Sequence, residues 1–284
     1  MLGGYPFPSS HMSTELNATT ERNKVNRALA EEAQQWKSKR NFKGKFILPA
    51  IFTHPAQLNN KTQRNAKVSL VTSAFQTSGA EGLWVVDSSL HDQEGTGSFM
   101  KRFKGIISLH AELNEVLAPR TLTVAGPYWA LGLVLWARKL VTYPALGVGR
   151  GFQYYIPGGA LPKAAKARVA LPPLRRQAVW SSNLKTWMEA SLQKIPTSDP
   201  AFVQFSDTLK QFAALKDKKT ARRQVAEFYK LWLKKFEIIP QDGRPMALYQ
   251  DFSSAYVLGK TLSDIPDQPK SPYRIAEQFM MISL

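Results

Sequence analysis

Residues 82–98, GLWVVDSSLHDQEGTGS, combine an apolar run with a polar loop that contains two glycines. The apolar run is short and mixes β-branched and aromatic residues, which is the pattern of a strand covered on both faces. Asp87 stands where the apolar run stops. The stretch therefore predicts a buried strand whose carboxyl end opens into a polar loop.

Three further segments between residues 45 and 149 show the same strand pattern. They are KFILPAIF (45–52), TLTVAGPYW (121–129) and PALGVG (144–149). Apolar residues with helical spacing fill the segments between them, at 61–76, 98–117 and 130–141. Strands and helices that alternate with short connections are typical of parallel βαβ units.

We therefore expect an α/β fold with a parallel sheet built from consecutive βα units. The pattern leaves open whether the sheet is doubly wound or part of a (β/α)8-like barrel. Five segments with helical composition follow residue 180, so the sheet is expected to precede a mainly α-helical, basic C-terminal half.

Composition divides the chain into four segments. Residues 1–44 are polar with one predicted helix, and within them residues 1–11 run into SSHM, which is typical of a cloning tag. We expect a parallel βα-unit domain at 45–157, a basic connector rich in Pro and Gly at 158–180, and a helical region at 181–284.

The charge balance points to an anionic partner. The chain has 38 Lys and Arg against 21 Asp and Glu, a formal net charge of +17 and a pI of about 10.0. Such an excess favours nucleic acid, DNA or RNA, bound through sequence-independent phosphate contacts, with an acidic protein as the alternative partner. No apolar run is long enough to span a bilayer, so we expect no membrane partner and a cytoplasmic location.

Residue types and motifs exclude several kinds of chemistry. The absence of cysteine excludes disulfides, thiolate zinc sites and cysteine nucleophiles. The segment GVGRGF (147–152) lacks the last glycine of a dinucleotide motif, and no Walker A sequence is present. No cofactor is predicted, and a divalent metal is unsupported because no HxH or HExxH spacing occurs.

Polar and aromatic residues follow all four predicted strands. The carboxyl ends of parallel strands share one edge of a sheet, so these residues are expected to share a rim. We assign catalytic roles to Asp87, as base or nucleophile, and to His54 and His91. Anion- and substrate-binding roles are assigned to Arg150, Tyr128, Trp129, Tyr154 and Tyr155. The alternatives are that Asp87 caps the next helix or closes a turn, and that the aromatic rings pack the core.

Two basic regions are candidates for phosphate contacts. The residues assigned to nucleic-acid binding are Lys163, Lys166, Arg168, Arg175 and Arg176 in the connector, and Lys218, Lys219, Arg222 and Arg223 in a helix at 216–235. In that helix, spacing predicts a buried stripe of Ala226, Tyr229, Leu233 and Phe236, with the basic residues on the other face. The alternative is an ordinary solvated helix face. Asp251, in an apolar setting, is expected to be a helix cap or the buried partner of an arginine.

Three functions remain open from the sequence. The first is nucleic-acid binding, with a processing activity at the strand-end rim around Asp87 as one form of it. The second is that of a non-catalytic basic subunit of a larger nucleoprotein or defence-type complex. The third is that of an enzyme acting on phosphorylated small molecules. The sequence does not decide whether the chain is an enzyme.

Overall fold

The computed structural model describes residues 4–6, 21–52, 58–87, 99–128, 130–146, 167–267 and 271–284. Contacts divide the chain into two compact units. The first contains the described residues up to Tyr128 together with Lys139–Ala145. The second contains α5 (Ala130–Ala137) and the described residues from Ala167 to Leu284.

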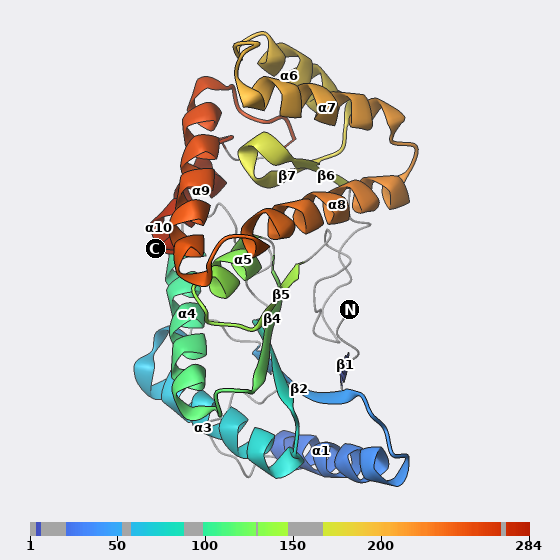
Figure 1. Ribbon diagram of the computed structural model, residues 1–284, viewed down its shortest axis with the longest axis vertical. Coiled ribbons are helices and arrows are strands. Elements are labelled where there is room, and N and C mark those ends of the chain that lie inside the picture. The colour runs from blue at the N-terminus through green and yellow to red at the C-terminus, as the bar shows by residue number, and fades with distance from the viewer. Residues whose placement is uncertain are drawn as a thin grey trace. The chain divides into compact units, whose positions relative to one another are not determined.

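A five-stranded sheet forms the centre of the first unit (Figure 1). In spatial order, which is also chain order, its strands are β1 (Gly4–Pro6), β2 (Lys45–Phe52), β3 (Gly82–Asp87), β4 (Leu122–Tyr128) and β5 (Tyr143–Leu146). Neighbours from β1 to β4 pair in parallel. Strands β2 and β3 are buried along nearly their whole length, with every residue of β2 after Lys45 buried, as a continuous apolar run requires.

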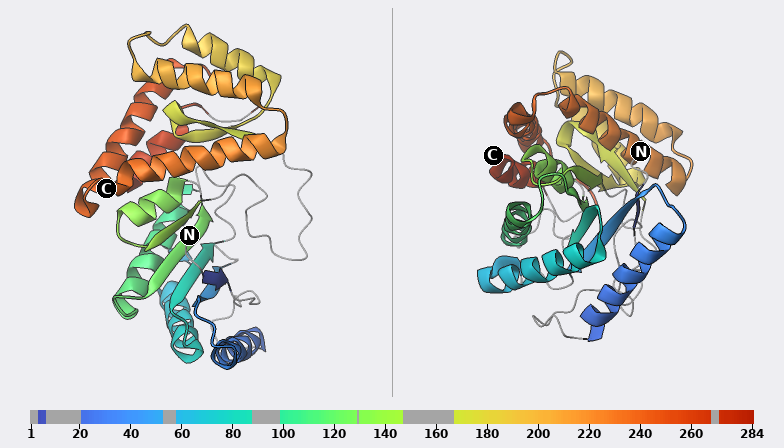
Figure 2. Two further views of the ribbon diagram at one scale, coloured as in Figure 1. Left: turned by 45° about the vertical axis from the view of Figure 1, so that its right-hand side comes forward. Right: turned by 60° about the horizontal axis from the view of Figure 1, so that its bottom comes forward.

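Three helices of the first unit pack side by side along the sheet (Figures 1 and 2). They are α1 (Glu21–Lys39), α3 (Lys61–Ser78) and α4 (Phe99–Val116). Crossovers between parallel strands are right-handed, so a strand order that follows the chain places successive helices on the same face. The predicted fold class is confirmed, and among the described strands the sheet stays open, with no reversal of strand order and no closed barrel.

Strand β1 was not expected. It lies within the segment 1–11 that resembles a tag, yet Gly4–Pro6 pair in parallel with Lys45, Phe46 and Ile47. The sequence GYP is too short to show a strand pattern of its own. Its pairing follows from the otherwise open edge of β2, whose backbone groups need partners.

A β-hairpin lies at the centre of the second unit, between helix α7 on one side and helix α8 on the other (Figure 1). Strands β6 (Arg168–Leu171) and β7 (Arg176–Val179) are antiparallel and joined by the 3₁₀ turn η2 (Pro172–Leu174). The remaining elements are α6 (Ser182–Leu192), α7 (Pro200–Ala214), α8 (Lys218–Glu237), η3 (Gln241–Gly243), α9 (Arg244–Thr261) and α10 (Arg274–Ser283).

The hairpin occupies part of the segment expected to be a connector. Val169, Leu171 and Ala178 are almost completely buried and belong to one core with Leu184 of α6 and Phe205 of α7. The proline, glycine and arginine content of 158–180 predicted a connector, but Pro172 and Pro173 form the turn, and every residue of the two strands except Arg168 is buried. This part of the predicted connector is therefore a structural element of the second unit.

Helix α5 also departs from the expected division at residue 157, because its contacts place it in the second unit. Nearly all its side chains are buried. Gln241 donates its side-chain amide to the carbonyl oxygens of Trp136 and Ala137, and Arg138 donates to the carbonyl of Ile282. An apolar helix can pack against any apolar surface within reach, so its position in the chain does not predict which unit contains it. In the described part of the chain, no helix has the length and apolar character needed to cross a membrane.

Candidate nucleic-acid interface

The ends of strands β3 and β4 bring together two predicted rim residues. The backbone N–H of Asp87 donates to the hydroxyl oxygen of Tyr128 at 2.5 Å, and both residues are buried. Burial, together with the negative charge of Asp87, raises the pKa of Tyr128 well above its usual value. The phenol therefore stays protonated at neutral pH and retains a hydrogen that it can donate.

The other predicted rim residues lie outside the described part of the chain. They are His54, His91, Trp129, Arg150, Tyr154 and Tyr155, and Lys163 and Lys166 of the connector lie outside it as well. Their grouping around Asp87 stays a prediction. Within the described residues, no cluster of three or more His, Asp or Glu side chains is placed to hold a metal ion.

His110 of α4 is buried in the first unit. Its two ring nitrogens have no hydrogen-bond partner among the described residues. Burial lowers its pKa from 6.5 to about 3, so the imidazole is neutral at physiological pH. This is the behaviour of a core residue, and nothing around it suggests a ligand.

The hairpin arginines predicted to bind nucleic acid are used inside the second unit. Arg176 is 2% exposed and donates through Nη1 to the carbonyl of Ser271 at 3.1 Å. Arg175 donates through Nε and Nη2 to the two carboxylate oxygens of Asp251, at 2.5 and 2.9 Å. Burial of the hairpin between helices is the reason that Arg176 is not a surface contact. Arg168, at the start of β6, is partly exposed.

Asp251 of α9 is the buried partner of an arginine, as its setting suggested. It also accepts from the indole N–H of Trp232 at 2.8 Å and from Lys235 Nζ at 2.5 Å. Burial alone would raise the pKa of Asp251, but the charges and hydrogen bonds of Arg175 and Lys235 outweigh it and lower the pKa below its usual value. The ionised carboxylate thus ties α9 to α8 and to the hairpin.

Helix α8 buries one face and exposes a basic one. The buried stripe is Ala221, Val225, Phe228, Tyr229, Trp232 and Phe236. Tyr229 and Phe236 were predicted in it, whereas Ala226 is exposed and Leu233 only half-buried. Aromatic residues on several sides of this helix offer more than one apolar stripe, and packing against β6 and α9 selects the one that contains Trp232.

The solvent side of α8 carries a line of four cations, Lys219, Arg223, Lys230 and Lys234, called the cationic stripe below. Successive members are four, seven and four residues apart, which places them on one side of the helix over about 22 Å. All four are exposed. Of the predicted contacts, Lys218 and Arg222 lie beside this stripe and are exposed too, so α8 presents all four of its predicted residues to solvent.

Ion pairing leaves most of the cationic stripe unneutralised. Lys230 pairs with Glu227 at 3.2 Å. The structure gives the other three members, Lys219, Arg223 and Lys234, no salt bridge within the described residues. Helix α8 as a whole has seven Lys and Arg against two Glu, so it presents a local positive field to solvent.

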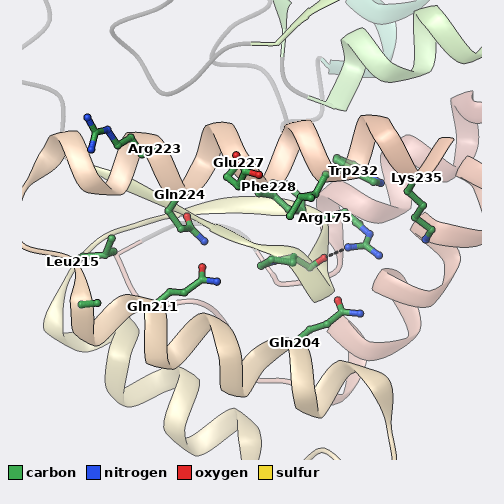
Figure 3. Close-up of a pocket in the computed structure, with 13 residues that line it drawn as sticks. Arg175, Gln204, Gln211, Leu215, Arg223, Gln224, Glu227, Phe228, Trp232 and Lys235 are labelled. Carbon is green, nitrogen blue, oxygen red and sulfur yellow. Dashed lines mark hydrogen bonds between the residues drawn. The ribbon is translucent and has the colours of Figure 1, made fainter. Parts of the chain in front are cut away.

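A groove of about 740 Å³ runs between α7 and α8 (Figure 3), and Arg223 is the member of the cationic stripe among its lining residues. Its wall on α8 includes Phe228, Leu231 and Trp232, while Gln204 and Gln211 reach into it from α7 (Figure 3). Gln224 also lines the groove, but its amide is engaged. It accepts from the N–H of Ala170 at 2.8 Å and donates to the same residue's carbonyl at 3.2 Å, which completes the edge of β6.

Charged residues line the same groove. They are Arg175, Arg223, Glu227 and Lys235, and Arg223 belongs both to the groove and to the cationic stripe. Sequence reasoning missed this groove. The only signal for it is the spacing of Gln204 and Gln211, which are seven residues apart and therefore lie on one side of α7.

Comparison with known proteins adds no relative. The chain matches no protein-family model, no curated protein and no solved structure.

Proposed function

We propose that the protein binds nucleic acid, without sequence preference, through the cationic stripe of α8. The observation that carries the proposal is the stripe itself: four exposed cations in one line, three of them free of salt bridges within the described residues. Phosphate oxygens are the partners that such a line suits, because each neutralised phosphate releases counterions and so favours binding entropically.

Neighbouring helices of the same unit support this interpretation over that of an ordinary solvated face. On α6, Lys185 faces Glu189 at 3.8 Å, and on α7, Lys210 faces Asp207 at 3.4 Å. Such pairing of opposite charges is usual for a helix surface that only meets water. Helix α8 has one such pair, Lys230 with Glu227, but its other three stripe cations have no salt bridge within the described residues, and a polyanion would relieve their mutual repulsion.

A binding assay with a matched control tests the proposal. The stripe variant is K219Q/R223Q/K230Q/K234Q, and the control is K39Q/K61Q/K101Q/K104Q, four exposed lysines of the first unit that lower the net charge equally. Fluorescence anisotropy with random-sequence DNA and RNA at 100 mM salt should show affinity reduced at least about tenfold for the stripe variant only. Equal losses in both variants would mean that net charge, and not this helix, governs binding.

The contact at the strand ends favours a second candidate function, a processing activity on the bound nucleic acid. A buried carboxylate at Asp87 beside the protonated phenol of Tyr128 has the residue types of a base and an acid. Labelled DNA and RNA incubated with the protein and Mg²⁺ should yield product, and Asp87→Asn should abolish it without lowering the unfolding midpoint. Intact substrates with the wild-type protein would remove this candidate and favour a non-catalytic subunit.

A further inference from the structure

We infer that the groove between α7 and α8 seats an unpaired base of a single-stranded nucleic acid whose backbone follows the cationic stripe. This rests on the proposed function and names its substrate class. Arg223 belongs to the stripe and also lines the groove, so a strand held by its phosphates on the stripe passes the groove at this residue.

The size and walls of the groove suit a flat heteroaromatic group. A volume of about 740 Å³ lies within the range of sites that hold nucleotide-sized ligands, roughly 300–1,000 Å³. Its wall is formed by the side chains of Leu231, Phe228 and Trp232, and Leu231 is more than half exposed. Burying a base against such a wall is favourable, whereas a base inside a duplex is stacked and paired and has no means of entering.

Two glutamines supply the polar contacts that a base needs. Gln204 and Gln211 point from α7 into the groove (Figure 3), and the described residues offer their amide groups no hydrogen bond. An amide both donates and accepts, which matches the paired donor and acceptor on the edge of a base, as in the contact of glutamine with adenine. In Gln224, by contrast, both the oxygen and the nitrogen of the amide are already hydrogen-bonded to Ala170.

The charges around the groove favour a phosphate-bearing ligand over a neutral one. Arg223 lies at one part of its rim, and Lys235 and Arg175 lie at another. Asp251 neutralises only part of the second group, because it is shared by Arg175 and Lys235. Lys235 is about half exposed despite this contact, so it can approach a phosphate.

The test compares three probes at 100 mM salt. They are a fluorescent oligo-dA of twelve nucleotides, an abasic oligomer with the same number of phosphates, and a duplex of the same length. Wild-type protein should bind oligo-dA about tenfold more tightly than the abasic oligomer, since one seated base contributes about 1–3 kcal/mol. Q204M/Q211M should remove this difference and leave binding of the abasic oligomer and the duplex unchanged.

Two further variants keep the result interpretable. A214W fills the groove from the exposed end of α7 without altering any charge on α8, and should also remove the preference for oligo-dA. Q76M/Q250M replaces two exposed glutamines away from the groove and should behave as wild type.

The outcomes separate this inference from the proposed function. Equal affinity for oligo-dA and the abasic oligomer, with binding still dependent on the stripe, overturns the inference and leaves the proposed function standing. Failure of all three probes to bind at low salt overturns both. Displacement of oligo-dA by polyglutamate of equal charge, with the glutamine variants unchanged, also overturns the inference and points to an acidic protein partner.

Discussion

The β6–β7 hairpin and helix α8 are both rich in basic residues in the sequence, but the structure uses these residues in different ways. Arg175 and Arg176 come from a segment as basic as α8, but their guanidinium groups bind Asp251 and a backbone carbonyl inside the second unit. Lys219, Arg223 and Lys234 face solvent. Density of positive charge in a sequence therefore does not separate residues that hold a fold together from residues that are available to a partner.

The largest expected change in stability follows from removing the charge of Asp251, which holds Arg175 and Lys235. Asp251→Asn removes the negative charge that Arg175 and Lys235 share, and leaves the guanidinium of Arg175, which is only 15% exposed, without its counterion. We expect the free energy of unfolding to fall by about 3 kcal/mol, because the desolvation of a buried ion is then uncompensated. Urea unfolding measures this change.

An exposed pair provides the control for that experiment. Asp207→Asn breaks the surface contact with Lys210, and the loss should stay below about 0.5 kcal/mol because water screens the charges. Similar losses in the two variants would contradict the structural role given to Asp251.

A smaller effect is expected at His110, which is buried like Arg176 but has no hydrogen-bond partner among the described residues. Its pKa is about 3 when folded, against 6.5 in an unfolded chain. Below pH 6.5 the unfolded chain therefore binds a proton that the folded protein does not, and stability falls as the pH falls toward 3. Between pH 7 and pH 5 this lowers the free energy of unfolding by about 2 kcal/mol.

Replacing His110 by Leu should remove most of that loss. Urea unfolding of both proteins at pH 7 and pH 5 measures the difference. Asp251 does not contribute in this window, because its lowered pKa means that its stabilisation is lost only in more acidic solution. A variant that weakens between pH 7 and pH 5 as much as the wild type would show that other groups control acid stability.

The smallest effect on stability is expected from the stripe. The variant K219Q/R223Q/K230Q/K234Q removes exposed charges that make one surface ion pair, so the free energy of unfolding should change by less than about 0.5 kcal/mol. Relief of mutual repulsion acts in the opposite direction to the loss of the Lys230–Glu227 pair. A large decrease in the free energy of unfolding would show that these residues stabilise the fold, as the hairpin arginines do.

The sequence predicted the strands β2 to β5 because each is an apolar run bounded by turn residues. It offered two roles for Asp251, a helix cap or the buried partner of an arginine, and the structure shows the second. The hairpin was missed because its strands are only four residues long and its prolines and arginines are typical of a connector. The buried stripe of α8 was predicted only in part, because aromatic residues lie on several sides of the helix and tertiary packing chooses among them.

The groove had no signal of its own. Gln204 and Gln211 are uncharged and belong to no motif. They form a groove only together with Leu231 and Phe228 of α8, and this pairing of helices cannot be seen in the sequence. The juxtaposition of Asp87 and Tyr128, by contrast, follows from one rule, that neighbouring parallel strands end at the same edge of a sheet. Local sequence patterns thus predict helices, strands and the residues at strand ends. The groove and the choice of buried face on α8 depend on packing between elements that are distant in the sequence.

The most direct test of the central claim is the salt dependence of nucleic-acid binding. Affinities of wild type, the stripe variant and the control K39Q/K61Q/K101Q/K104Q are measured for one random-sequence single strand between 50 and 300 mM salt. Loss of four phosphate contacts should reduce the slope of log K against log salt concentration by about 3 in the stripe variant, with the control unchanged. A stripe variant that keeps the wild-type slope would contradict the assignment of α8 as the nucleic-acid interface.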